Sequence, residues 1–156
     1  MQRMTKRLLL PALILFIFSG CEKKNTPNEF PDMPIRFTSG GEMNLKEIDA
    51  NAVLVLYQPD CDHCQREARE IKSHMDSFRQ YGVFFITNYQ FNQINAFARI
   101  QQLDQESNVF FAQTDVNHIL DHFGPIETPS VFIYREGKKV AQFIGETPID
   151  QIIEAL

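Results

Sequence analysis

The sequence has no tryptophan, only three cysteines among 156 residues, and no apolar run long enough for a membrane-spanning helix of about twenty residues. Its 15 basic and 20 acidic residues give a net charge of −5, so the chain lacks the basic surface that a nucleic-acid-binding protein needs. It also lacks internal repeats and low-complexity segments. The 44% of hydrophobic residues are enough for one domain with a buried core.

The first twenty residues have the pattern of a secretory signal peptide. Arg3, Lys6 and Arg7 form a positive region, and an apolar run over residues 8–18 follows. Ser19, Gly20 and Cys21 resemble a bacterial lipobox, although Phe18 stands where leucine is usual. The sequence therefore predicts a lipoprotein-type signal peptide over residues 1–20 and a lipid on Cys21. The alternative is an ordinary signal peptide cleaved nearby, which leaves Cys21 free.

Residues 21–34 have little periodicity and contain three prolines between residues 22 and 34, which predicts a flexible tether. The folded domain is expected over residues 35–156. With the lipid, this organisation predicts a protein of the bacterial cell envelope, anchored to a membrane at its periplasmic or other extracytoplasmic face.

Cys61 and Cys64 form the Cys-x-x-Cys motif of the segment PDCDHCQRE. Such a pair can bind a metal, form a structural disulfide or exchange electrons with other proteins. A disulfide across two residues closes so small a loop that it constrains the unfolded chain very little. A structural role is therefore a poor explanation for this pair.

Apolar runs that alternate with helical patterns predict the fold. Strands are expected at residues 52–57, 83–89, 108–112, 131–134 and 140–144. Apolar stripes predict helices that include residues 68–78, 94–101, 116–123 and 149–156, the last with Thr147 as N-cap and Pro148 as first residue. This order predicts a three-layer α/β/α sandwich around a mostly parallel sheet, with a hairpin turn at residues 135–140.

The position of the cysteines favours redox chemistry. Pro59 and Asp60 supply a turn after the first buried strand, and Cys61 falls at a helix N-terminus, where free backbone N–H groups and the helix dipole favour a thiolate. Cys64, one turn later, is expected to be the resolving thiol.

Residues around Cys61 are expected to tune this reactivity in opposite directions. His63 is predicted to stabilise the thiolate and so make the pair more oxidising, whereas Asp60 and Asp62 oppose it. We expect the helix dipole and His63 to dominate, because water screens exposed carboxylates.

Thr128-Pro129 stands just before a predicted strand, where a cis peptide bond is a good candidate. With the Cys-x-x-Cys helix, the hairpin and the C-terminal helix, the chain resembles the thioredoxin fold with its central mixed sheet. A strand–helix segment inserted between Val83 and Phe123 makes it similar to the TlpA/ResA-like branch of exported, membrane-anchored thiol–disulfide oxidoreductases.

The resemblance implies that Thr128-Pro129 packs beside Cys61 and holds an extended substrate segment. It also implies a monomer without a dissociable cofactor, which acts on protein dithiols and disulfides and is recharged by a redox partner. The chain departs from thioredoxins at Asp60, where they usually have tryptophan, and at Val55, where they have a buried acid. Asp60, Asp62 and Glu127 remain as candidates for handling the proton of Cys64.

The main alternative is an exported copper- or zinc-binding protein without redox turnover, in which Cys61, His63 and Cys64 hold the metal. A closed zinc site needs four ligands, and no second Cys/His pair is evident. His118 and His122 are spaced i, i+4 but are expected on the solvated side of their helix.

Two further readings are a peroxidase and a scaffold with an inert cysteine pair. The peroxiredoxin pattern of Pro, three residues, Thr or Ser, two residues and Cys is absent before Cys61 and before Cys64. A scaffold predicts thiols that do not react at neutral pH.

Overall fold

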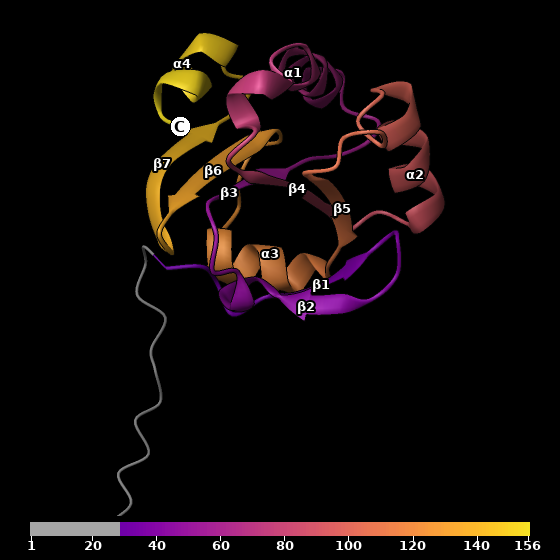
Figure 1. Ribbon diagram of the computed structural model, residues 1–156. Helices are drawn as coiled ribbons and strands as arrows, with labels where there is room; N and C mark the ends of the chain where they lie inside the picture. The colour runs from indigo at the N-terminus through magenta and orange to yellow at the C-terminus, as the bar shows by residue number, and fades with distance from the viewer. Residues whose placement is uncertain (1–28) are drawn as a thin grey trace, which may run out of the picture.

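The computed structural model describes residues 29–156, so the predicted signal peptide and Cys21 lie outside the described residues. A seven-stranded sheet separates two helical layers (Figure 1), which confirms the expected three-layer α/β/α sandwich. The strands are β1 (Pro34–Phe37), β2 (Glu42–Asn44), β3 (Ala52–Leu56), β4 (Gly82–Thr87), β5 (Val109–Gln113), β6 (Ser130–Arg135) and β7 (Lys138–Ile144). The helices are η1 (Leu45–Glu47), α1 (Asp62–Ser73), η2 (Met75–Phe78), α2 (Phe91–Ile100), α3 (Val116–Phe123) and α4 (Ile149–Glu154).

The strand order is β2-β1-β5-β4-β3-β6-β7. Strand β4 pairs in parallel with β3 and β5, whereas the four other pairings are antiparallel. The prediction of a mostly parallel sheet is therefore wrong, and the mixed sheet implied by the thioredoxin resemblance is confirmed. The β1–β2 hairpin was not predicted, because its short, partly exposed strands lack a continuous apolar run.

Both faces of the sheet are buried, because the central strands β3, β4 and β6 are apolar along almost their whole length. Alternate side chains of β3 point to opposite faces. Val53 and Val55 join the core beneath α1, α2 and α4, and Leu54 and Leu56 join the core that α3 covers (Figure 1).

The domain begins before residue 35. Phe30 and Met33 are buried in the core on the α3 side, and the ring of Phe30 stacks on Tyr134 at a centroid distance of 4.1 Å. The predicted tether therefore extends too far at its C-terminal end. The spacing of the prolines indicated a linker there, but Phe30 and Met33, which stand between the prolines, pack against the sheet.

The observed ends of α3 are those predicted from the sequence, whereas the ends of the other helices differ from the prediction. Helix α1 stops at Ser73, and the apolar stripe that predicted one helix continues in the separate turn η2. Thr147 is not the N-cap of the last helix, since Pro148 holds that position and α4 begins at Ile149. No helix among residues 29–156 is both long enough and apolar enough to cross a membrane.

Candidate functional site

Cys61 lies at the end of the loop between β3 and α1, as the N-cap residue of α1. Its extended backbone aims the Sγ atom at the first turn, where the backbone N–H of Cys64 donates to it over 3.3 Å. Cys61 is half-buried, and both cysteines are free thiols in the structure. A sulfur at this position receives a hydrogen bond that a thiolate accepts better than a neutral thiol.

The segment before β6 meets this sulfur from the other side. The Cys61 thiol donates to the carbonyl oxygen of Thr128 over 3.7 Å, and the Thr128–Pro129 peptide bond is cis. Pro129 itself is buried. The fold thus brings Cys61 and Thr128, 67 residues apart, to one place at the ends of β3 and β6.

Cys64 has a different environment from Cys61. Its side chain is 2% exposed and belongs to the core beneath α1. Burial raises the pKa of the Cys64 thiol to about 12, and its hydrogen bond with Cys61 acts in the same direction. The pair therefore consists of one accessible sulfur and one covered, protonated sulfur.

Glu67 is a buried acid that the sequence interpretation missed. It is 2% exposed and lies on the same buried stripe of α1 as Cys64, one turn further along. Its Oε2 atom accepts from the backbone N–H of Thr147, and its buried Oε1 atom has no hydrogen-bond partner among the described residues. Burial raises the pKa of Glu67 to about 7. An acidic residue within an apolar stripe, at i+3 from Cys64, was the available signal.

The acids named from sequence lie elsewhere. Asp60, Asp62 and Glu127 are exposed, and Val55 is buried in β3 without a polar group to offer. Within the described residues, Glu67 is the buried carboxyl group nearest in sequence to Cys64.

His63 contacts a residue 83 positions later in the chain. Its Nδ1 atom lies 2.5 Å from Oε2 of Glu146, in the loop between β7 and α4. Arg66 also binds this carboxylate, with Nε 2.8 Å from Oε1 and one terminal nitrogen 2.7 Å from Oε2. These contacts hold the pKa of Glu146 well below its ordinary value, at about 2, with Arg66 the larger cause and His63 the next. The predicted partner of His63 was the Cys61 thiolate, and the structure gives it Glu146.

An apolar groove of about 280 Å³ runs from Thr128 along α3. Val116 and Leu120 form its outer wall and are 44% and 47% exposed. Ile119 of α3 also lines it. The other lining residues come from the ends of β3 and β4 and from the segment before β6, and they are Leu56, Tyr57, Gln58, Ile86, Asn88, Gly124, Pro125, Ile126 and Thr128. Because Thr128 also contacts Cys61, a chain in this groove would lie next to the accessible sulfur.

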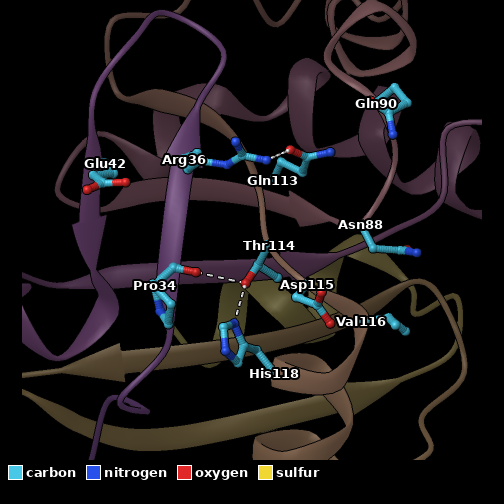
Figure 2. Close-up of a pocket in the computed structure, with 10 residues that line it drawn as sticks. All are labelled: Pro34, Arg36, Glu42, Asn88, Gln90, Gln113, Thr114, Asp115, Val116 and His118. Atoms are coloured by element: carbon cyan, nitrogen blue, oxygen red, sulfur yellow. Dashed lines mark hydrogen bonds between the residues drawn. The ribbon is translucent and has the colours of Figure 1, made fainter.

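A more polar hollow of about 460 Å³ adjoins the groove, since both are lined by Asn88 and Val116. Figure 2 shows Arg36 and Gln113 pointing toward each other across it, in a hydrogen bond of 2.5 Å. Below them the Thr114 hydroxyl donates to the carbonyl oxygen of Pro34 and lies 3.4 Å from Nδ1 of His118 (Figure 2).

The two histidines of α3 have separate surroundings. His118 lines this hollow beside Thr114, whereas Nε2 of His122 lies 3.0 Å from the carbonyl oxygen of Asp32. Over residues 29–156, no group of three or more His, Cys, Asp or Glu side chains has the geometry to hold a metal ion. His74, at the end of α1, binds the carbonyl oxygen of Glu70.

A mixed sheet between helical layers, a cysteine pair opening α1 and a cis-proline beside the first cysteine define a protein of the thioredoxin-like class. The sequence bears this out, because residues 43–156 match the family described as thioredoxin-like domain. The chain therefore belongs to the thioredoxin-like family. A search of curated protein sequences gives no match.

Several solved structures share the fold at low sequence identity. A secreted Mycobacterium tuberculosis disulfide oxidoreductase homologous to Escherichia coli DsbE is 15% identical, with a TM-score of 0.64 over 80% of this chain and 93% of its own. Mycobacterium tuberculosis DsbF, in mixed oxidised and reduced forms, is 15% identical, with a TM-score of 0.67 over 80% and 92%. A peroxiredoxin-like protein from Aquifex aeolicus is 16% identical, with a TM-score of 0.66 over 81% and 82%. At these identities the likeness concerns the fold.

Proposed function

We propose that the protein is a thiol–disulfide oxidoreductase that exchanges electrons with protein disulfides or dithiols through Cys61 and Cys64. The observation that carries this proposal is the placement of the half-buried Cys61 sulfur between the N–H of Cys64 and the carbonyl oxygen of Thr128. Membership of the thioredoxin-like family and the disulfide oxidoreductases that share the fold support it.

In the reducing direction the Cys61 thiolate attacks one sulfur of a partner disulfide, and the other partner sulfur leaves as a thiolate. Cys64 then loses its proton and attacks the Cys61 sulfur of the mixed disulfide. The Cys61–Cys64 disulfide forms, the second partner thiolate is released, and two electrons have passed to the partner. Partner thiols drive the same steps backwards when the protein acts as an oxidant.

Glu67 is the group that we propose receives the proton of Cys64, directly or through water. Its pKa of about 7 lets it take up and release a proton near neutral pH, which the exposed acids Asp60, Asp62 and Glu127 are less suited to do in a buried site. Because Thr147 N–H binds only one carboxylate oxygen, the other is free for this role within the described structure.

The partner segment is proposed to lie in the apolar groove beside Thr128. This groove is continuous with the Cys61 contact, and the exposed side chains of Val116 and Leu120 offer apolar surface that an extended chain would cover. The substrates are therefore proteins with an apolar side chain close to the reacting cysteine.

A trapping experiment tests the activity. The Cys64→Ser variant retains the attacking sulfur but cannot resolve, so it accumulates a mixed disulfide with a protein substrate, visible on a non-reducing gel. The Cys61→Ser variant forms none, and the wild type turns over without accumulating the adduct. A wild-type protein that fails to reduce or oxidise any dithiol, while binding copper or zinc stoichiometrically through Cys61 and Cys64, contradicts the proposal and supports the metal-binding alternative.

The domain is proposed to act as a monomer at the extracytoplasmic face of a membrane, held by a lipid on Cys21 and recharged there by a redox partner. The support comes from the signal peptide and lipobox patterns of residues 1–21. Labelled fatty acid should enter the wild-type protein and not the Cys21→Ser variant. Equal labelling of both proteins contradicts the anchor and leaves the redox activity untouched.

A further inference from the structure

The loop between β7 and α4 connects three parts of the thiol site through consecutive residues. The N–H of Gly145 donates to the carbonyl oxygen of Pro129 over 2.9 Å. Glu146 binds His63 and Arg66 of α1, and the N–H of Thr147 donates to Glu67. This loop is therefore fixed to the segment beside Cys61 and to the helix that carries both cysteines.

Glu146 supplies the only charged side chain of this loop, and its two carboxylate oxygens are fully engaged. Arg66 binds them with two nitrogens, and Nδ1 of His63 lies 2.5 Å from Oε2. Nδ1 of His63 also lies 2.7 Å from a terminal nitrogen of Arg66, so the three side chains meet in one cluster.

The position of Arg66 matters for Cys61. Besides its hydrogen bond with Glu146, which is the largest cause, the charges of Asp62 and of Cys61 raise the pKa of Arg66. Arg66 stands on the helix that begins directly after Cys61, and its partner Glu146 follows Gly145, whose N–H binds the carbonyl oxygen of Pro129 beside Thr128. A positive charge near Cys61 favours the thiolate, and a carboxylate bound to that charge offsets the effect.

We propose that Glu146 is a positioning residue that fixes His63 and Arg66 and offsets the positive charge of Arg66 at Cys61, making the cysteine pair less oxidising. The inference rests on the proposed thiol–disulfide exchange. A thiolate exists only in the reduced form, so whatever disfavours the thiolate disfavours the reduced pair. Glu146 changes the equilibrium between the reduced and the disulfide form, whereas Cys61 and Cys64 carry out the exchange.

Other charged or titratable groups lie on the elements around Cys61. Glu67 lies in the core beneath α1, and Tyr89 follows β4, with its pKa raised mainly by Asp60 and to a smaller extent by Cys61. They are Asp60 before the helix, Asp62, His63, Arg66 and Glu67 on α1, Tyr89 after β4, Glu127 before β6, and Glu146 after β7. Among these, Glu146 and Arg66 form a bound pair whose charges can be removed separately or together.

A double-mutant cycle on this pair tests the inference. The four proteins are the wild type, Glu146→Gln, Arg66→Gln and the double variant. Two readouts are the midpoint of the pH profile for alkylation of Cys61, resolved by mass spectrometry, and the equilibrium constant with a glutathione redox buffer. Removing Glu146 should lower the midpoint and stabilise the reduced form roughly twofold to fivefold. A fivefold change corresponds to about 20 mV for this two-electron couple.

Removing Arg66 should shift both readouts the opposite way, and the double variant should lie close to the wild type. Asp76→Asn is the matched control, because Asp76 also binds an arginine, Arg79, in an exposed pair that belongs to the turn after α1. A purely structural role predicts shifts of the same sign in both single variants. That result, or shifts no larger than the Asp76→Asn control, overturns the inference while the wild-type exchange stands. A wild type that never equilibrates with glutathione contradicts the proposed function itself.

Discussion

The backbone N–H of Thr147 donates to Oε2 of Glu67 over 2.9 Å, although 80 residues separate the two. Thr147 lies just before α4, and Glu67 lies within α1, so the bond ties together the two helices on this face of the sheet. It satisfies one oxygen of a buried carboxyl group whose other oxygen has no hydrogen-bond partner among the described residues. The buried acid of this site therefore depends on a loop far from it in sequence.

The stability of the protein should fall as the pH rises through the pKa of Glu67. Burial raises the pKa of Glu67 from 4.5 to about 7, so the folded protein holds the proton more tightly than the unfolded chain. The contribution of Glu67 is complete below pH 4.5 and is lost as the pH rises through about 7. Glu67→Gln should remove this dependence and raise the free energy of unfolding by about 1–3 kcal/mol at a pH of about 8. Urea unfolding of the reduced proteins at several pH values measures it.

Glu70→Gln is the control for this prediction, because Glu70 is an exposed carboxylate on the same helix. It should keep the wild-type dependence between pH 4.5 and 7. An unchanged slope in Glu67→Gln contradicts the assignment of a buried acid with a raised pKa. If Glu67 also takes the Cys64 proton, the variant should slow resolution of the mixed disulfide without slowing its formation.

The two thiols should differ widely in reactivity toward iodoacetamide. The pKa of Cys64 is raised from 9.0 to about 12, which lowers its thiolate fraction roughly a thousandfold near neutral pH, and the side chain is 2% exposed. Cys61 is half-buried and should be alkylated at least about a hundredfold faster, as peptide mass spectrometry can show. In concentrated guanidinium chloride the two rates should become similar. Equal rates in the folded protein would mean that Cys64 is not enclosed.

The apolar groove beside Thr128 should govern reaction with proteins and not with small disulfides. Leu120 is 47% exposed at its wall, so Leu120→Gln should fold normally and lower kcat/KM for an unfolded protein disulfide roughly threefold to tenfold, through lost apolar contact. Its rate with glutathione disulfide should stay at the wild-type level. Val140→Gln is the control, since Val140 is 43% exposed on the edge strand β7, outside the groove. Equal effects of both substitutions, or an effect on glutathione disulfide, contradict docking in the groove.

The start of the domain can be tested through Phe30. Its ring is 4% exposed and stacks on Tyr134, so Phe30→Ala should leave a cavity and lower the free energy of unfolding by about 3 kcal/mol. Denaturant unfolding of a protein that begins at residue 29 measures this loss. The neighbouring Glu29 is exposed, and Glu29→Ala should lie close to the wild type. A negligible loss in Phe30→Ala means that residues 29–33 do not contribute to the fold.

Much of the fold follows from local patterns. The apolar runs at residues 52–57, 83–89 and 131–134 predict β3, β4 and β6, which are buried on both faces, and α3 has the bounds that its stripe and Gly124 predict. Patterns of this kind fail where an element is short or half-exposed, as in β1 and β2, and where buried side chains stand between prolines, as Phe30 and Met33 do. Periodicity also does not distinguish one long helix from a helix followed by a tight turn, as at Ser73.

The sequence by itself determined the chemistry of the site: two cysteines at the start of a helix, a Thr-Pro segment before a strand, and no second group of metal ligands. Each of these features is a short motif or a residue count, so it can be recognised in the sequence without knowledge of the tertiary contacts. Only the tertiary structure decided the partners. It turned His63 and Arg66 toward Glu146, enclosed Glu67 under the loop that contains Thr147, and opened an apolar groove next to Thr128. Each of these contacts joins residues from separate elements, and their proximity arises from strand order and packing, which no local pattern encodes.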